Sequence, residues 1–378
     1  MNKDNFDIAI CGAGPVGMAL AALLARSSLS PARIVLIDAK TLAQASVDAR
    51  AIALSHGSRQ ILEEIGAWPI ESTAIHQIHV SRRGRFGRSL IDRSQHNLPA
   101  LGYVTRYGEL VKALGAVCMR AGVTVLRPAR VLSSCEGADG LVLKIDSSGP
   151  RELRAAIVVQ AEGGLFSDQQ NKTRHRDYQQ TAIVAQVRTS APIAHRAYER
   201  FTDEGPLALL PLGADYALVW CVRPETARAL VALDDAAFLA QLGTAFGTRL
   251  GRFTQASQRA SYALGLNADA GRTQRSVAIG NAAQTLHPVA GQGLNLGLRD
   301  AAVLARLLAQ SATPDRLRQF TQLRQQDRDM TLRLTDTLAR IFANTMPLQA
   351  VLGLSLGLID MVDPARYLLA ELMMYGRR

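Results

Sequence analysis

The chain has 378 residues and a formal charge of +11, from 43 Lys plus Arg and 32 Asp plus Glu. Hydrophobic residues make up 48% and charged residues 20%, as in folded globular domains, which excludes a disordered, collagen-like or coiled-coil chain. At ~100–200 residues per domain, the length predicts two or three units.

The first 40 residues carry the pattern of a strand–helix–strand unit. Phe6–Cys11 is a short apolar run that ends in glycines, as a buried parallel strand does. Val16–Arg26 is rich in Ala and Leu and predicts a helix, and Arg33–Ile37 predicts a second buried strand that ends at Asp38. Together these pieces have the size of one βαβ unit.

The next 120 residues or so alternate helices and short strands. Ser55–Ile65 and Tyr107–Arg120 predict helices, and Ser81–Arg88 predicts the tip of a β-hairpin. Short strands are expected at Thr124–Leu126, Val131–Ser134, Leu141–Ile145 and Ala155–Val159.

From Thr181 the pattern changes to alternating, β-branched and aromatic stretches with Gly and Pro at the turns. This pattern predicts a separate antiparallel sheet, because one face of such a sheet packs on a core and the other does not. Its strands are expected at Thr181–Thr189, His195–Thr202, Leu207–Leu212 and Tyr216–Val222. A helix at Asp235–Phe246 and a strand at Ser261–Leu266 follow.

The end of the chain returns to the first pattern. Ser276–Ile279 predicts a buried strand that runs into Gly280, and helices are expected from Gly293 onward. The first and last parts should share one domain, because a lone βαβ unit cannot bury both faces of its sheet. The predicted division is discontinuous, with a parallel-sheet domain over 1–75, 96–180 and 267–310, an antiparallel-sheet domain over 76–95 and 181–266, and a helical region over 311–378.

The first glycine segment predicts a dinucleotide site. Gly12, Gly14 and Gly17 follow a strand and open a helix, and Asp38 lies at the end of the next strand. The glycines allow a tight turn, close approach of the backbone to a pyrophosphate, and close helix packing. A carboxylate at Asp38 accepts hydrogen bonds from ribose hydroxyls and repels a 2′-phosphate, which favours FAD or NAD over NADP. The alternative is an accidental glycine-rich turn.

A second glycine-rich segment, Gly280–Asn295, favours FAD over NAD. It again follows a buried strand and feeds a helix, some 270 residues after the first. An elongated FAD needs two such sites, one for the pyrophosphate and one for the isoalloxazine. Backbone N–H groups around Gly293, Leu294 and Asn295 could stabilise negative charge on the reduced ring. The alternative is a helix cap that happens to contain glycine.

Taken together, five segments resemble the FAD-dependent aromatic hydroxylases of the p-hydroxybenzoate hydroxylase type, in their ubiquinone-biosynthesis branch. They are GAGPVG at 12–17, DARAIALS at 48–55, LGYVTRYGEL at 101–110, AEGG at 161–164 and the block Gly280–Asp300. The resemblance covers the whole chain and implies an α/β fold: a Rossmann-like FAD-binding domain with a parallel sheet, an antiparallel-sheet substrate domain and C-terminal helices.

This resemblance implies a role for residues of both glycine segments. Gly12, Gly14 and Gly17 would hold the pyrophosphate of FAD, and Asp38 the adenosine ribose. The other positions that would contact FAD are Arg50, Arg106, Glu162, Asn281, Gly291, Gly293, Leu294 and Asn295. The segment around Glu162 departs from the family pattern, which has Asp there, so its part in handling NAD(P)H is in question.

The resemblance also implies a substrate site over the flavin. Pro288 lies where a relative's proline carbonyl contacts the phenol, and His287 could relay the phenol proton or merely hold the loop. Strands bearing Tyr198, Leu209 and Trp220 would form a wall over the flavin and line an apolar pocket.

The implied activity is a monooxygenase cycle. NAD(P)H, as a transient co-substrate, reduces FAD; O2 then forms a C4a-hydroperoxide, and one oxygen passes to a polyprenyl phenol. Two alternatives remain open: a flavin-binding scaffold subunit of a ubiquinone-biosynthesis complex without turnover, and another FAD oxidoreductase of the same fold that works without O2.

Partners and location follow from charge, cysteines and apolar segments. The four cysteines lie far apart, which predicts no metal site and a reduced, cytoplasmic setting, and the start of the chain has no basic signal region. The basic charge comes with no nucleic-acid-binding motif. An arginine cluster at 82–88 is either a solvated turn or a surface that attracts the inner membrane face. The apolar region after Pro347 is either a core segment or a surface that contacts the membrane or a biosynthetic complex.

Overall fold

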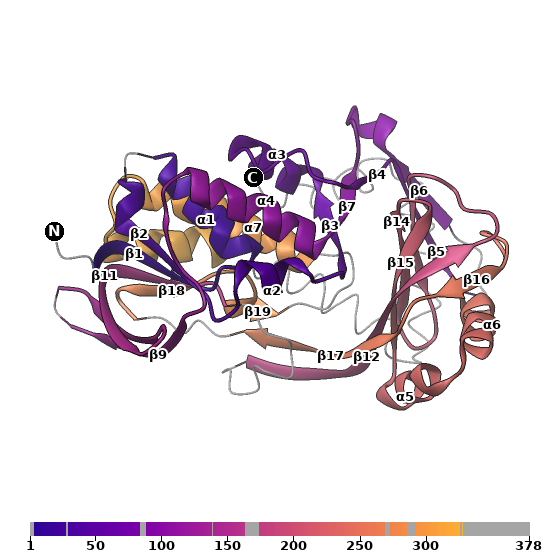
Figure 1. Cartoon of the computed structure of the whole chain (residues 1–378). Coiled ribbons are helices and arrows are strands. Elements are labelled where there is room, and N and C mark those ends of the chain that lie inside the picture. The colour runs from indigo at the N-terminus through magenta and orange to yellow at the C-terminus, as the bar shows by residue number, and fades with distance from the viewer. Residues whose placement is uncertain are drawn as a thin grey trace.

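In the computed structural model (Figure 1), residues 4–27, 29–83, 88–137, 139–162, 174–268, 273–285, 292–325 and 327 are described. They form a first unit around a seven-stranded sheet, a large nine-stranded sheet beside it, and a small three-stranded sheet between. The predicted α/β fold class is confirmed. The residue boundaries of the predicted domains stay a prediction.

The sheet of the first unit is mainly parallel, as predicted. Its strands run in the order β8 (Thr124–Leu126), β2 (Ile34–Ile37), β1 (Asn5–Cys11), β11 (Pro150–Gln160), β10 (Leu141–Asp146) and β9 (Arg130–Glu136). Strand β18 (Ser276–Ala278) pairs in parallel with the second half of β11 and so carries the end of the chain back into the first sheet. This return joins the first and last predicted parts, because a parallel sheet needs cover on both faces.

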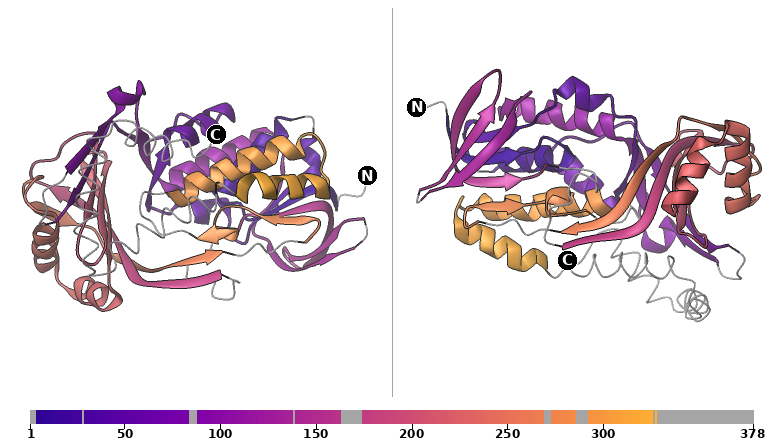
Figure 2. Two further views of the ribbon diagram at one scale, coloured as in Figure 1. Left: turned by 180° about the vertical axis from the view of Figure 1, so that it is seen from behind. Right: turned by 90° about the horizontal axis from the view of Figure 1, so that it is seen from below.

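Helices cover one face of this sheet. They include α1 (Pro15–Ala25), α4 (Tyr107–Arg120) and α7 (Gln292–Leu308), with α1 in contact with both of the others (Figure 2). Their apolar sides meet Ile8 and Ile10 of β1 in the main core, where both residues are fully buried. The other face is closed by the strands β9 and β10 around Leu143 and Ile145. Two shorter helices, α2 (Leu42–Ser46) and α3 (His56–Glu64), complete the unit.

The small sheet is not foreseen by the sequence. It consists of β3 (Ala51–Ser55), β7 (Gly102–Arg106) and β4 (Thr73–Ile75), paired antiparallel. In strands of three to five residues, apolar and polar residues alternate too few times for the sequence to distinguish the strand from a loop. They matter because β3 and β7 carry Arg50 and Arg106 near their ends.

The large sheet contains the four predicted antiparallel strands and the predicted hairpin. Its order is β19 (Gln284–Thr285), β17 (Ala260–Ala268), β12 (Arg174–Thr189), β15 (Asp215–Val222), β14 (Pro206–Leu212), β13 (Arg196–Phe201), β5 (Gln77–Arg82) and β6 (Arg88–Asp92), with β16 (Phe253–Ala256) beside β12. All its pairs are antiparallel except β5 with β13, which is parallel.

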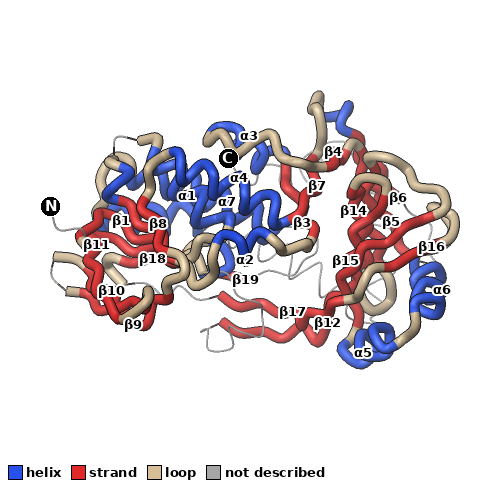
Figure 3. Tube along the Cα trace, in the orientation of Figure 1, coloured by secondary structure: helices blue, strands red, loops and turns tan. Residues whose placement is uncertain are grey.

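Two helices, α5 (Pro224–Ala232) and α6 (Asp235–Phe246), pack on the side of the large sheet that faces away from the first unit (Figure 3). The opposite side of the sheet faces the first unit and the small sheet, while β12 and β17 extend beneath toward it. These two sides decide which strand residues can meet a ligand of the first unit.

Residues 314–325 form one further helix, and most of the predicted C-terminal region lies outside the described residues. In the part of the chain that the structure describes, no helix has the length and apolar character needed to cross a membrane.

Candidate functional site

The first glycine turn has the geometry of a phosphate cradle. Gly12 has a φ of +107°, and a side chain there would lie 2.6 Å from the backbone of Ala161 and Glu162. A Cβ at Gly17 would lie 2.0 Å from the carbonyl oxygen of Gly12, so only glycine lets α1 start this close to β1. The N-cap of α1 is Gly14, which has no side chain to accept from the first-turn N–H groups. These donors and the helix dipole fit the pyrophosphate of FAD.

Asp38 holds the same turn from the neighbouring strand. Its Oδ2 accepts from the backbone N–H of Ala13 at 2.7 Å, and its Oδ1 accepts from that of Lys40 at 2.8 Å. The guanidinium of Arg127 lies 3.5 Å from Oδ1. A carboxylate has about four acceptor positions, so one remains for a ribose hydroxyl. Asp38 therefore shapes the cradle in addition to its predicted role in ribose binding.

Glu162 lies on the other side of this turn, after the end of β11. Partial burial and the negative charge of Asp38 raise the pKa of Glu162, while Arg130 counteracts the shift. The structure thus brings two acidic groups to the rim of the glycine turn, one from β2 and one from β11. Their repulsion favours a ligand that donates hydrogen bonds between them.

The second glycine segment lies against the first. Gly280 has a φ of +58°, and a Cβ there would meet the Val16 side chain at 3.3 Å. A Cβ at Gly297 in α7 would lie 2.7 Å from Cγ2 of Val16 and 3.1 Å from Cα of Gly280. Residues far apart in the sequence therefore form one close contact. A single elongated ligand can reach both segments.

The start of α7 supplies the second helix N-terminus of the site. A Cβ at Gly293 would lie 3.8 Å from Oδ1 of Asn281, which places the Asn281 amide beside the first turn of α7, with Leu294 next along the helix. The first N–H groups of a helix have no partner within it and carry partial positive charge. This end of the site suits an electron-rich ring edge.

Asn295 uses its side chain inside the protein. Its Oδ1 accepts from the backbone N–H of Ser55 at 2.8 Å and from the hydroxyl of Ser58 at 2.7 Å. Its Nδ2 donates to the carbonyl of Ala53 at 3.1 Å, and the side chain is buried. The Asn295 side chain therefore fixes α7 to β3 and α3, and any contact with the predicted ligand falls to the backbone.

The two predicted arginines have different surroundings. Arg50 pairs with Asp48 at 2.6 Å and lies over the Tyr107 ring, with its guanidinium carbon 5.2 Å from the ring centre. Arg106 donates to Oε1 of Gln186 at 3.2 Å and so connects the small sheet to the large one. Arg50 keeps considerable exposure and could contact a nucleotide.

The predicted pocket residues Tyr198, Leu209 and Trp220 lie on the opposite side of the large sheet, which corrects the sequence-based expectation. All three are buried in the core that includes Phe238 and Phe246 of α6. The ring centres of Tyr198 and Phe246 are 5.4 Å apart. A strand with alternating side chains has two faces, and the alternation alone does not say which of them the helices cover; here the larger aromatic residues fill the covered one.

The face toward the first unit carries small or aliphatic residues at most of the alternate positions. Across the strands, Glu199 pairs with Ala208, Ala208 with Val219, and Val219 with Val184. These four side chains keep partial exposure, whereas most of their immediate neighbours in the strands are buried. We call this row the inner wall. Small side chains along it leave room for a bulky apolar ligand.

Glu199 is the charged residue of the inner wall, and it was not predicted from the sequence. Its side chain forms no ion pair or hydrogen bond with the described residues, and burial raises its pKa to about 7. Ala208 also pairs with Val219, two residues before Cys221 of β15, so Cys221 shares the face of Glu199, and the charge of Glu199 helps to raise the pKa of Cys221. The signal available in the sequence was a lone acid between Ala197 and Phe201, the apolar residues that share its face of β13.

His287, Pro288 and Gly291 lie outside the described residues, and their predicted roles stay predictions.

Several known proteins are similar in sequence to most of this chain. A family model described as "FAD binding domain" matches residues 5–331. Ubiquinone hydroxylase UbiL of Rhodospirillum rubrum is 33% identical over 380 residues, covering 96% of this chain and 88% of that protein. The 3-demethoxyubiquinol 3-hydroxylase of Escherichia coli is 30% identical over 319 residues, covering 82% and 81%.

Solved structures share the fold at low identity. The p-nitrophenol 4-monooxygenase PnpA of Pseudomonas putida has a TM-score of 0.79 at 16% identity and covers 99% of both chains. PqsL of P. aeruginosa, solved with 2-aminobenzoylacetate, has a TM-score of 0.74 at 21% identity, covering 90% of this chain and 97% of that one.

Proposed function

The chain belongs to the FAD-binding domain family of flavoprotein aromatic hydroxylases, and on this premise we propose that it hydroxylates the ring of a polyprenylated phenol. It is an FAD-dependent monooxygenase of ubiquinone biosynthesis, with NAD(P)H as the co-substrate typical of its class. The substrate and the roles of individual residues are the proposal.

The residues present fit FAD. The close backbone approach at Gly12 and Gly17 and the N-terminus of α1 suit the pyrophosphate, and the start of α7 suits the ring. Bound FAD supplies the activation of O2 after reduction by NAD(P)H. The remaining tasks fall to the protein, which binds and orients the substrate, excludes water and moves the phenol proton.

The inner wall supports an apolar substrate. Its row of Ala208, Val219 and Val184 faces the first unit, which we call the flavin unit from here on. An apolar, water-poor surface protects reactive oxygen chemistry from side reactions. The segments Tyr198–Leu212 and Gly280–Asp300 are similar to those of 2-polyprenyl-6-methoxyphenol hydroxylase, which favours a substrate of that type.

Glu199 is proposed to accept the phenol proton. A phenol becomes a stronger nucleophile as its proton leaves, and a base works best when its pKa lies near the working pH. Burial raises the pKa of Glu199 to about 7, and the carboxyl group lies in the wall that faces the flavin unit. His287 remains the alternative proton acceptor.

The observation that carries the proposal is the contact between the two glycine segments at Val16, Gly280 and Gly297, with the inner wall facing the unit that holds them. It joins the two ends of a single FAD site. A site for NAD alone would not need the second segment.

The test uses the purified, yellow protein with NAD(P)H, a detergent-dispersed 2-polyprenyl-6-methoxyphenol and 18O2. We expect the product to gain one 18O atom per NAD(P)H consumed in its formation, as read by mass spectrometry. Bound FAD without any labelled product, in the absence of partner proteins, would instead support the scaffold alternative. Product formed equally well without O2 would support a dehydrogenase.

A further inference from the structure

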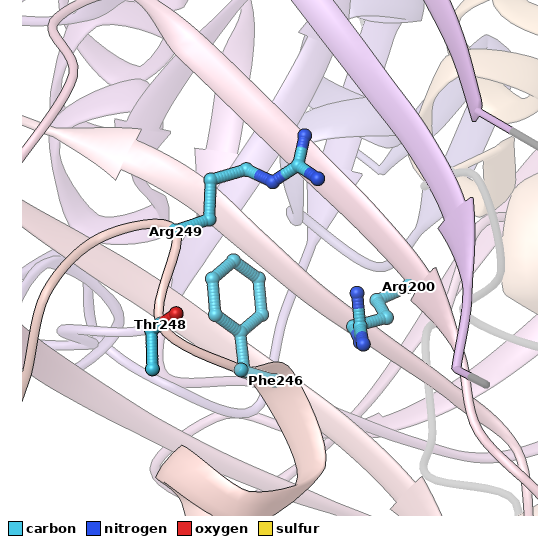
Figure 4. A pocket seen from close by; sticks show the side chains of 5 residues that line it. Arg200, Phe246, Thr248 and Arg249 are labelled. Carbon is cyan, nitrogen blue, oxygen red and sulfur yellow. The ribbon is translucent and has the colours of Figure 1, made fainter.

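A second feature lies on the far side of the large sheet from the flavin unit. There an open pocket of about 520 Å³ is lined by Arg200, Phe246, Gly247, Thr248 and Arg249. Figure 4 shows the Arg249 side chain above the Phe246 ring and Arg200 to its right, with the Thr248 hydroxyl nearby. None of the site residues described above lines this pocket.

Among the described residues, no acid balances the charges in the pocket. Arg200 donates to the carbonyl of Ala245 at 3.1 Å, and Arg249 donates to Nε2 of His79. Neither guanidinium forms an ion pair with a described carboxylate, although many other arginines do. Two guanidinium groups at one pocket, neither of them paired with a described carboxylate, favour an anion between them.

A third cation strengthens the same field. The backbone N–H of Arg83 donates to the carbonyl of Phe201 at 2.9 Å, which fixes Arg83 beside the end of β13, next to Arg200. Burial, together with the charges of Arg249 and Arg83, lowers the pKa of Arg200.

We propose that this pocket binds a phosphate group through Arg200 and Arg249. Paired guanidinium groups match the geometry of phosphate oxygens, and the Phe246 ring and the Thr248 hydroxyl complete an amphipathic floor. Two sources have this chemistry: the headgroup of an anionic phospholipid and a free phosphate or phosphorylated solute.

Its position favours the lipid. The large sheet separates the pocket from the flavin unit, so a nucleotide held here could not present its nicotinamide to FAD. A headgroup in the pocket would instead dock this side of the protein on a membrane surface, with Arg83 beside it. The inference goes beyond the proposed hydroxylation and does not depend on it.

The experiment is vesicle co-sedimentation of the FAD-loaded protein. The vesicles are phosphatidylcholine alone, or phosphatidylcholine with phosphatidylglycerol, at low and at physiological salt. The test protein is Arg200→Gln/Arg249→Gln, and the matched control Arg120→Gln/Arg306→Gln removes the same charge from exposed positions of α4 and α7, both on the first unit. The single variant Arg249→Gln guards against misfolding, and flavin absorbance reports the integrity of each protein.

We expect binding to the anionic vesicles only, weakened about 30-fold in the pocket variant and little changed in the control, since each basic group near such a surface contributes about 1 kcal/mol. If the pocket binds a soluble phosphate instead, the wild type and the pocket variant should bind the vesicles equally. Inorganic phosphate should then raise the melting temperature of the wild type and not that of the pocket variant. Equal vesicle binding and equal response to phosphate would overturn the proposal.

Discussion

Gly14 is the residue at which an added side chain is expected to compete with the FAD pyrophosphate for space. A Cβ there would lie 3.3 Å from the hydroxyl of Tyr107, a contact that a small shift can relieve, and the backbone φ is ordinary for any residue. We therefore expect Gly14→Val to lower FAD content at least about tenfold while most of the fold remains. Absorbance of the purified protein measures this.

Gly243→Ala is the matched control for that substitution. Gly243 lies in α6, and none of the described heavy atoms lies within 4 Å of the position that an added methyl group would take. Alanine should therefore stabilise the helix by up to about 1 kcal/mol and leave FAD content unchanged. Full FAD retention in Gly14→Val would show that the pyrophosphate does not approach this turn.

Glu199 gives the reaction its expected dependence on pH. Its pKa of about 7 lies above the ordinary carboxyl value, so the ionised base forms as the pH rises through 7. We expect kcat of the wild type to rise over that range, and Glu199→Gln to lower kcat about 100-fold with a flat profile and little change in KM. An unchanged profile would assign the proton to another group, such as His287.

Stability provides a separate check on Glu199. Because its folded pKa is raised, the carboxyl group favours the folded state at low pH, and this contribution is lost as the pH rises toward and through 7. Glu199→Gln should therefore melt at a higher temperature than the wild type above pH 7 and at a similar temperature below pH 4. Cys221 on β15, whose pKa the charge of Glu199 raises, is unchanged in both proteins.

At this scale the glycines and Asp38 were predictable from the sequence, because a tight turn leaves few residue choices. The prediction failed for Tyr198, Leu209 and Trp220, since alternation defines two faces without saying which one a helix covers. For Asn295 the prediction concerns the backbone N–H and stays a prediction, whereas the three hydrogen bonds of its side chain depend on tertiary structure that the sequence does not reveal.

At the scale of elements, α7 is positioned by that buried amide. Asn295→Ala would leave the N–H of Ser55, the hydroxyl of Ser58 and the carbonyl of Ala53 without this partner. We expect the free energy of unfolding to fall by about 3 kcal/mol, and by only about 1 kcal/mol in Ser58→Ala, which removes one of the three bonds. Urea unfolding measures both, and a loss of FAD without destabilisation would contradict the structural role.

The packing of α7 on α1 is tested by a double-mutant cycle. A methyl at Gly297 would lie 2.7 Å from Cγ2 of Val16, so Gly297→Ala should destabilise the protein by about 1–3 kcal/mol and weaken FAD binding. Val16→Ala removes the nearer obstacle, and the double variant should be more stable than the sum of the two single effects predicts. Strict additivity in unfolding experiments would mean that the two glycine segments do not meet.

Long or strongly patterned elements were predictable, and short ones were not. The strands β1 and β2, the helix α4 and the strands β12–β15 each follow a clear periodicity or an uninterrupted apolar run. The small sheet of β3, β4 and β7 depends on pairing between segments that are far apart in the sequence, and no local pattern encodes that pairing.

At the scale of the whole molecule, the first unit holds the predicted cofactor site and the large sheet presents the inner wall to it. The hydrogen bond from Arg106 to Gln186 and the packing of Ala197 against Val104 join the small sheet to the large one. The return of β18 beside β11 brings the second glycine segment to the sheet that carries the first. This return was predictable, because a lone βαβ unit cannot cover its own sheet.

The most direct measurement is a crystal structure of the protein with FAD. We expect the diphosphate at the Gly12–Gly14 turn, and the isoalloxazine between the start of α7 and the inner wall of Glu199, Ala208, Val219 and Val184. An isoalloxazine bound away from α7, or a second glycine segment that does not touch the cofactor, would contradict this arrangement.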